Sequence, residues 1–210
     1  MFDLCPSCGE VRFDVTVDSI ASEVICPACG HREPFHPEPL LVVSGAGGAG
    51  KSSVLRELRG TREDVVLLDS DVLWREEFWD ELEWYFRTWL LVCRDVAQSR
   101  HPPVLFGAGF GVPENLEAHP QHEFFSAIHY CVLVCDDDEL ERRLRARPAD
   151  RNPDRVDVEQ YTVEEQVEYN RWLKDAADRE EFTALDTTDA TVEETAAAVD
   201  RWITSRVTAG

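Results

Sequence analysis

From residue 40 onward, short apolar runs alternate with longer segments in which apolar positions recur every three or four residues. The runs predict strands at Leu40–Ser44, Val65–Leu68, Val104–Phe106, Tyr130–Val134 and Thr183–Leu185. The longer segments predict helices at Lys51–Arg59, 74–99, Asp138–Arg147, Glu159–Arg179 and Val192–Arg206. Strands this short and apolar are typical of a sheet buried on both faces. The pattern therefore predicts an α/β fold with about five parallel strands flanked by helices.

The first 37 residues have a different character, since they hold four of the seven cysteines in two CxxC pairs. A glycine follows each pair, where a tight knuckle needs a left-handed residue. Between the pairs, apolar and polar residues alternate from Val11 to Val17, which is the period of a strand. Two knuckles that each offer two thiolates predict a tetrahedral zinc site, formed by Cys5, Cys8, Cys26 and Cys29.

Two other interpretations of these cysteines stay open, a redox pair and an iron–sulfur site. A disulfide is disfavoured because the sequence opens without a basic or apolar leader, and the cytosol keeps thiols reduced. His31 and His36 lie nearby, but four thiolates already fill a zinc shell, so we interpret both as bystanders. So short a segment cannot build a core alone, and the metal is expected to supply much of its folding free energy.

A proline-rich run between residues 34 and 39 follows the cysteine pairs. Pro34, Pro37 and Pro39 make this run a predicted stiff linker. The sequence thus predicts a zinc ribbon at 1–37 and a larger domain at 38–210.

The charge balance narrows the choice of partners. The chain of 210 residues has 42 Asp and Glu against 21 Lys and Arg, a net charge of −21. Such acidity repels nucleic-acid phosphates and anionic lipid, so we expect no membrane partner and disfavour nucleic acid. No apolar run is long enough to span a bilayer, and we expect a cytoplasmic protein.

The strongest motif is a complete GxxxxGK[ST] sequence between a predicted strand and a predicted helix. Glycines let the backbone approach phosphates, and its N–H groups and the helix N-terminus favour anions. The lysine reaches the β- and γ-phosphates, and the serine hydroxyl binds Mg²⁺. The candidate nucleotide-binding residues are Gly45, Ala46, Gly47, Gly48, Ala49, Gly50, Lys51, Ser52 and Ser53.

Two carboxylates follow the second predicted strand, at Asp69 and Asp71. Ligands of open α/β sheets bind at the carboxyl ends of the strands, so both acids are candidates for chemistry. We assign Asp69, with Ser52, to the Mg²⁺ side, and Asp71 to the acceptor as base or substrate contact. The alternative is that one of them merely caps the next helix.

Arginines cluster between residues 142 and 155, in a chain with only two lysines. They are Arg142, Arg143, Arg145, Arg147, Arg151 and Arg155. Planar guanidinium groups offset charge on a transferring phosphoryl group, and Arg143 and Arg147 share a predicted helix face. The alternative is that these arginines pair with the acidic run at 136–139 and cover a solvated helix.

With these motifs, residues 40–210 resemble the small P-loop kinases, the superfamily of shikimate, gluconate, adenylate and nucleoside kinases. The resemblance implies ATP as the donor, and the preference for ATP over GTP rests on this resemblance alone. It also implies an acceptor contact at 69–71, an arginine-rich lid near 142–157 and an adenine-side loop near 185–195. The glycine-rich segment 107–111 lacks the acidic or arginine-bearing motif of adenylate kinases, which argues against a nucleoside-monophosphate kinase.

The sequence predicts a Mg²⁺-dependent kinase that phosphorylates a small hydroxylated acceptor, such as a nucleoside, sugar or hydroxy acid. The acceptor pocket is expected to use Gly107–Gly111 and an aromatic-rich stretch, Trp74, Trp79, Trp84, Tyr85 and Trp89, although each aromatic alone is better explained as core. One alternative is an ATP-hydrolysing switch in which the ribbon docks a protein or RNA. Another is an RNA 5′-hydroxyl kinase, because Arg75 follows Asp71 at a spacing that resembles such enzymes.

Overall fold

The computed structural model of the chain describes residues 3–11, 15–75, 78, 80–146, 162–178 and 182–208. In chain order, its elements are β1 (Thr16–Asp18), β2 (Glu23–Ile25), β3 (Arg32–Pro34), β4 (Leu40–Gly45), α1 (Lys51–Leu58), β5 (Val66–Asp69), η1 (Ser70–Leu73), α2 (Leu82–Ala97), β6 (Pro103–Phe106), α3 (Glu114–Glu117), η3 (Pro120–Phe124), β7 (Ile128–Val134), α4 (Asp137–Arg145), α5 (Val163–Ala177), β8 (Phe182–Asp186) and α6 (Val192–Val207).

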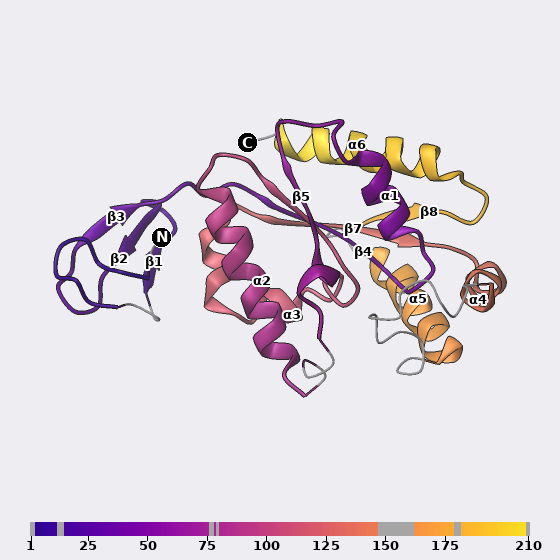
Figure 1. Ribbon diagram of the computed structural model, residues 1–210, viewed down its shortest axis with the longest axis horizontal. Coiled ribbons are helices and arrows are strands. Elements are labelled where there is room, and N and C mark those ends of the chain that lie inside the picture. The colour runs from indigo at the N-terminus through magenta and orange to yellow at the C-terminus, as the bar shows by residue number, and fades with distance from the viewer. Residues whose placement is uncertain are drawn as a thin grey trace.

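The larger sheet has the strand order β5-β6-β4-β7-β8, and every neighbouring pair is parallel. Its central strand β4 is buried along its whole length. Leu40 and Val42 enter the core on one face, and Leu41 and Val43 enter the core on the other. Helices α1 and α6 cover one face, and α2, α3 and α5 lie on the opposite side (Figure 1). The predicted α/β fold with five parallel strands is confirmed.

The expected long helix at 74–99 is wrong in its first third, because α2 begins only at Leu82. A 3-10 helix, η1, ends at Leu73, and Trp74 adopts extended backbone angles. Rings on both sides of the break pack together: Trp74 lies edge-on to Tyr85 at 5.1 Å, and Phe78 stacks on Trp84 at 5.0 Å. The aromatic spacing therefore comes from a segment packed against α2. The short helices α3 and η3, between β6 and β7, were not predicted.

The cysteine-rich segment forms a separate antiparallel sheet of β1, β2 and β3. The expected strand from Val11 to Val17 is only partly present, since β1 begins at Thr16 and Val11 forms an isolated bridge with Leu4. Residues 12–14 lie outside the described residues. This sheet sits at one end of the long axis of the molecule, and α4 lies at the other end (Figure 1).

A small mixed interface joins the cysteine-rich sheet, here called the ribbon, to the part of the chain that contains the five-stranded sheet. Phe35, in the proline-rich run, packs its ring 5.1 Å from that of Phe124 in η3, and both side chains are buried. Arg94 of α2 adds two further contacts. Its guanidinium carbon lies 5.4 Å from the centre of the Phe124 ring, and its Nη2 lies 3.5 Å from the carboxylate of Asp3. Gln98 bonds to the backbone of His36 in both directions, at 2.9 and 3.3 Å. The proline-rich run is therefore part of a packed contact.

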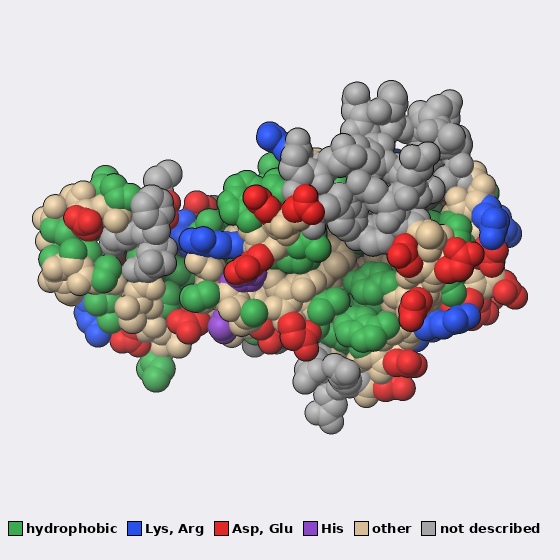
Figure 2. Space-filling model, turned by 90° about the horizontal axis from the view of Figure 1, so that it is seen from below, with side chains coloured by type: hydrophobic (Ala, Val, Ile, Leu, Met, Phe, Trp, Pro, Cys, Tyr) green, Lys and Arg blue, Asp and Glu red, His purple; other side chains and the backbone are tan. Residues whose placement is uncertain are grey.

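No helix within the described ranges combines the length and apolar character needed to cross a membrane. Asp and Glu side chains spread over the face seen from below (Figure 2). Lys and Arg side chains are fewer on that face, in keeping with the net charge of −21.

The interface predicts that Phe124→Ala destabilises the protein by about 3 to 5 kcal/mol, because a buried aromatic side chain is removed from two elements at once. Urea unfolding followed by tryptophan fluorescence measures the change. Ile20→Ala, at a fully exposed ribbon residue, should change stability by less than about 0.5 kcal/mol. Equal changes in unfolding free energy for the two substitutions would contradict a stabilising role for this contact.

Candidate phosphate-binding and metal sites

The loop between β4 and α1 has the geometry of an anion site. Gly50, the N-cap of α1, adopts φ 105, and no side chain caps the helix. The first turn of α1 also carries no acidic residue. Since the first N–H groups of a helix have no partner within it, this end of α1 presents positive potential to the loop. The strand–loop–helix context predicted for the motif is present.

The side chain of Lys51 folds back over the loop. Its Nζ donates hydrogen bonds to the carbonyl oxygens of Gly45 at 2.6 Å and Ala46 at 3.0 Å. The ammonium group therefore lies at the loop and carries positive charge to the place where phosphate oxygens are expected.

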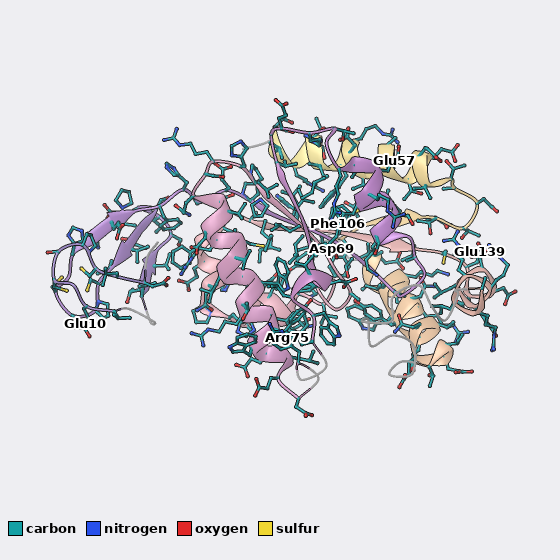
Figure 3. All side chains as sticks on the ribbon, in the orientation of Figure 1. Glu10, Glu57, Asp69, Arg75, Phe106 and Glu139 are labelled. Carbon is teal, nitrogen blue, oxygen red and sulfur yellow. The ribbon has the colours of Figure 1, made fainter. Side chains whose placement is uncertain are left out.

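The two predicted acids lie at the carboxyl edge of the sheet next to this loop. Lys51, Ser52, Asp69 and Asp71 line one small hollow, together with Leu55, Phe106 and Gly107. The hollow has a free volume of about 10 Å³, room for about one water molecule. Asp69 ends β5 beside Phe106 of β6, at the centre of the molecule (Figure 3). Residues predicted from separate motifs thus meet in space.

Asp69 also caps the 3-10 helix η1, which is the alternative role for one of the two acids. Its Oδ1 accepts a hydrogen bond from the N–H of Asp71 at 3.2 Å and so caps η1. Its Oδ2 lies 4.0 Å from the guanidinium of Arg59, a long contact between partly exposed groups. A cap and a Mg²⁺ contact are compatible, because a carboxylate has two oxygens and about four lone-pair directions.

Arg143 holds the segment that follows β8. Its Nη1 donates to the Thr187 hydroxyl at 3.0 Å, and its Nη2 donates to the carbonyls of Thr187 and of Thr188. Its Nε pairs with Glu139 at 2.7 Å. These bonds fix α4 to the loop between β8 and α6. A contact of Arg143 with a phosphoryl group would require them to be exchanged.

The other described arginines of the cluster pair with glutamates of their own helix. Arg142 contacts Glu139 at 2.6 Å, and Arg145 contacts Glu141 at 2.7 Å. Arg142, with Arg143, lowers the pKa of Glu139 to about 2. The alternative of a solvated, ion-paired helix therefore describes Arg142 and Arg145. Arg147, Arg151, Arg155 and most of the expected lid lie outside the described residues.

A larger pocket of about 430 Å³ opens near η1, along the first turns of α2. Its described lining is mainly apolar, with one cation and one anion: Leu73, Arg75, Phe78, Glu81, Trp84, Tyr85 and Thr88. The Tyr85 hydroxyl donates to the carbonyl of Ser70 at 2.8 Å, which ties this wall to η1. Burial, only partly offset by that bond, raises the pKa of Tyr85 to about 12, so the hydroxyl stays protonated.

Other members of the expected acceptor wall have different positions. Trp89 is buried in the core, as its alternative interpretation held, and Trp79 lies outside the described residues. The segment 107–111 backs the wall, since the Phe110 ring packs against Tyr85 and Phe86 at 5.7 and 5.0 Å. Gly107 is held tightly there, because a Cβ atom on it would lie 2.3 Å from the Ser70 hydroxyl.

The four predicted zinc ligands form one cluster in which all sulfurs lie within 4.8 Å of one another. Cys5 Sγ lies 3.7 Å from Cys29 Sγ, and Cys8 Sγ lies 3.9 Å from Cys26 Sγ. A tetrahedral zinc ion with Zn–S bonds of about 2.3 Å places its sulfurs about 3.8 Å apart, so the cluster fits this ion. Both knuckle glycines, Gly9 and Gly30, adopt the expected left-handed φ, 73 and 72.

The pKa values of two of the four thiols are shifted in opposite directions. Burial opposes ionisation of Cys5, but the backbone N–H groups of Cys8 and Ser7 outweigh it and lower its pKa to about 6. Cys8 accepts a bond from the backbone of Glu10, yet neighbouring Cys29 and burial together raise its pKa to about 12. A divalent ion would stabilise thiolates at all four positions. The sulfur cluster lies in the ribbon, at the end of the molecule that carries Glu10 (Figure 3).

Comparison with solved structures places the fold. A sugar kinase from Janibacter sp. HTCC2649 aligns over 82% of this chain and 98% of its own, with 11% identity and a TM-score of 0.57. The chain has the fold of a small P-loop kinase. The protein APE1195 aligns over the same shares, with 14% identity and a TM-score of 0.53.

A chain of the Pnkp1/Rnl/Hen1 RNA repair complex aligns over 69% of this chain, with 18% identity and a TM-score of 0.51. The alignment spans about half of that chain, 47%. No protein-family model and no curated protein sequence matches this chain. At these identities the likenesses show the fold alone.

One contact at the P-loop was missed by sequence reasoning. Gln166 of α5 accepts a hydrogen bond from the N–H of Gly47. The two residues are 119 positions apart, and no motif links them.

The cysteine geometry predicts that the purified protein carries a single zinc ion, measured by elemental analysis. Cys26→Ser should lose the ion and unfold the ribbon, because a metal site is the main support of so small a sheet. Cys93→Ser, at a buried cysteine outside the cluster, should retain it. Metal-free wild-type protein with a folded ribbon would contradict the assignment, and iron in the analysis would favour the iron–sulfur alternative.

Proposed function

We propose that this protein is a Mg²⁺-dependent kinase that transfers the γ-phosphoryl group of ATP to a small hydroxylated acceptor. The observation that carries the proposal is the meeting of Lys51, Ser52, Asp69 and Asp71 around one hollow, beside an apolar pocket. Phosphoryl transfer needs little covalent chemistry from a protein. Positioning and electrostatic stabilisation suffice, and these residues supply both.

Each residue has a distinct role in the proposal. Backbone N–H groups of the loop at 45–50 and the Lys51 ammonium bind the phosphates, and Ser52 and Asp69 would hold Mg²⁺, which shields phosphate charge. Asp71 orients the acceptor hydroxyl and takes its proton as the new oxygen–phosphorus bond forms. The bond to the bridging oxygen of ADP breaks in the same step. Arg143 and Arg147 stay candidates for offsetting charge on the transferring group, Arg143 after release from Thr187.

The pocket beside η1 suits an acceptor with a flat or apolar part. Trp84 and Phe78 offer stacked rings, and Arg75 offers a guanidinium group to an anion on the same molecule. Glu81 and Thr88 add hydrogen-bonding groups for hydroxyls. These features favour a ring-bearing acceptor, such as a nucleoside or an aromatic hydroxy acid, over a small linear polyol.

An RNA 5′-hydroxyl kinase is the second candidate. Arg75 lines the pocket and follows Asp71 by four residues, and one similar structure belongs to an RNA repair complex. The pocket supplies an anion contact next to a stacking surface, which a terminal nucleotide would use. The net charge of −21 opposes binding of a long polyanion, so this candidate ranks below a small acceptor.

The first test measures ADP release from ATP and Mg²⁺ against nucleosides, sugars, small hydroxy acids and a 5′-hydroxyl oligonucleotide. One class should stimulate ADP release strongly and yield a phosphorylated product by mass. Lys51→Met should lower that rate on the order of 100-fold or more while the protein stays folded, because the phosphates lose a fixed cation. Full activity of Lys51→Met would end the proposal. Slow hydrolysis unaffected by any acceptor would favour the nucleotide-switch alternative.

The division of labour between the two acids predicts different defects. Asp71→Asn should slow transfer on the order of 100-fold with nearly unchanged ATP binding, because it removes only the proton acceptor. Asp69→Asn is the matched control and should instead raise the Mg²⁺ concentration needed for half-maximal activity. Single-turnover transfer and nucleotide titration separate these effects. Parallel loss of ATP binding and transfer in Asp71→Asn would reassign Asp71 to the metal.

A further inference from the structure

The side chain of Gln166 lies against the phosphate loop. It comes from the first turn of α5, which a capping box fixes: Thr162 N–H donates to Glu165 at 2.7 Å, and Glu165 N–H donates to the Thr162 hydroxyl at 3.1 Å. Gln166 Oε1 accepts the N–H of Gly47. A Cβ atom on Gly47 would lie 2.9 Å from that oxygen and 3.4 Å from Cδ, so the amide packs directly on the loop backbone.

The position of this oxygen is chemically informative. The backbone N–H groups of a P-loop donate hydrogen bonds to phosphate oxygens. A side-chain amide oxygen accepts the same kind of hydrogen bond as a phosphate oxygen, but it carries no net charge. A single N–H makes one strong hydrogen bond at a time. Gln166 and a nucleotide phosphate therefore compete for the N–H of Gly47.

Helix α5 is anchored in a way that keeps Gln166 in place. One turn further along, Asn170 bonds to the backbone of Cys135 in both directions, at 2.7 and 3.3 Å. Arg171 pairs with Asp137 at 2.6 Å. Val167 and Tyr169 pack in the same apolar cluster as Ala46 of the loop. Release of the Gly47 N–H thus requires only a change of the Gln166 rotamer, while the helix stays where it is.

We propose that Gln166 sets the nucleotide affinity of the phosphate loop: its side-chain oxygen occupies the Gly47 N–H in the nucleotide-free protein, and a nucleotide phosphate binds by displacing it. This inference rests on the proposed function in that a nucleotide is the ligand of the loop. It goes further by assigning an opposing role to a residue outside the motif. Its direction is specific, since removing the amide should strengthen binding.

The test compares ADP and ATP affinities of wild type, Gln166→Ala and Gln166→Met by isothermal titration calorimetry. Both variants should bind about 3- to 10-fold more tightly, because the net worth of a neutral hydrogen bond no longer opposes the phosphate. Gln166→Met keeps the bulk and helix propensity of the side chain and removes its amide group. Gln166→Glu should bind more weakly than wild type, because a carboxylate holds the N–H more strongly and repels phosphate. Glu168→Ala, at an exposed position of the same helix, is the matched control and should leave affinity unchanged.

A second readout needs no nucleotide. Amide hydrogen exchange at Gly47 should be faster in Gln166→Ala than in wild type or Glu168→Ala, because the N–H loses its acceptor. Unchanged exchange, or nucleotide affinity that stays equal or falls in both Gln166→Ala and Gln166→Met, would overturn the inference. Wild-type nucleotide binding in the same titrations would leave the kinase proposal standing. Absence of binding in every variant would end both.

Discussion

The backbone N–H groups at the start of α1 are the constraint around which this structure is arranged. They need an anion or another acceptor, and they face the edge where β4, β5 and β6 end. Because β4 lies in the middle of the sheet and is buried on both faces, the loop that follows it is held by packing on two sides. The same parallel order brings Asp69 and Asp71 from the end of β5 to Ser52. The site is therefore a consequence of topology.

Helix α2 runs from the pocket beside η1 to the ribbon. Its first turns line the pocket beside η1, through Trp84 and Tyr85. Its last turns hold the ribbon, through Arg94 and Gln98. A sixteen-residue helix packed in the core is a rigid body, so the ribbon and the pocket share one structural element. The metal cluster replaces the core that the ribbon is too small to build, and the Phe35–Phe124 contact joins that sheet to η3.

Features fixed by local spacing could be predicted from the sequence. The loop at 45–50, the cysteine knuckles and the strand cores depend on neighbours within a few residues, and their positions follow from period and motif. The start of α2 could not be predicted, because Trp74 and Phe78 satisfy a helical period although both precede the first residue of α2. The bonds of Arg143 to Thr187 and of Gln166 to Gly47 span long stretches of chain. No local pattern marks such contacts, since only the tertiary fold brings their partners together.

The phosphate loop takes several of its hydrogen-bond partners from the chain itself. A buried N–H without an acceptor, or a cation without an oxygen, costs free energy, so a stable fold supplies partners from its own chain. Here Lys51 turns to the carbonyls of Gly45 and Ala46, and the N–H of Gly47 turns to Gln166. Ligand affinity then reflects the difference between these internal bonds and those made to phosphate. The lysine bonds are built from the motif itself, whereas the Gln166 bond comes from a helix outside the motif. Position 166 is therefore where we expect the affinity of the loop to be tuned.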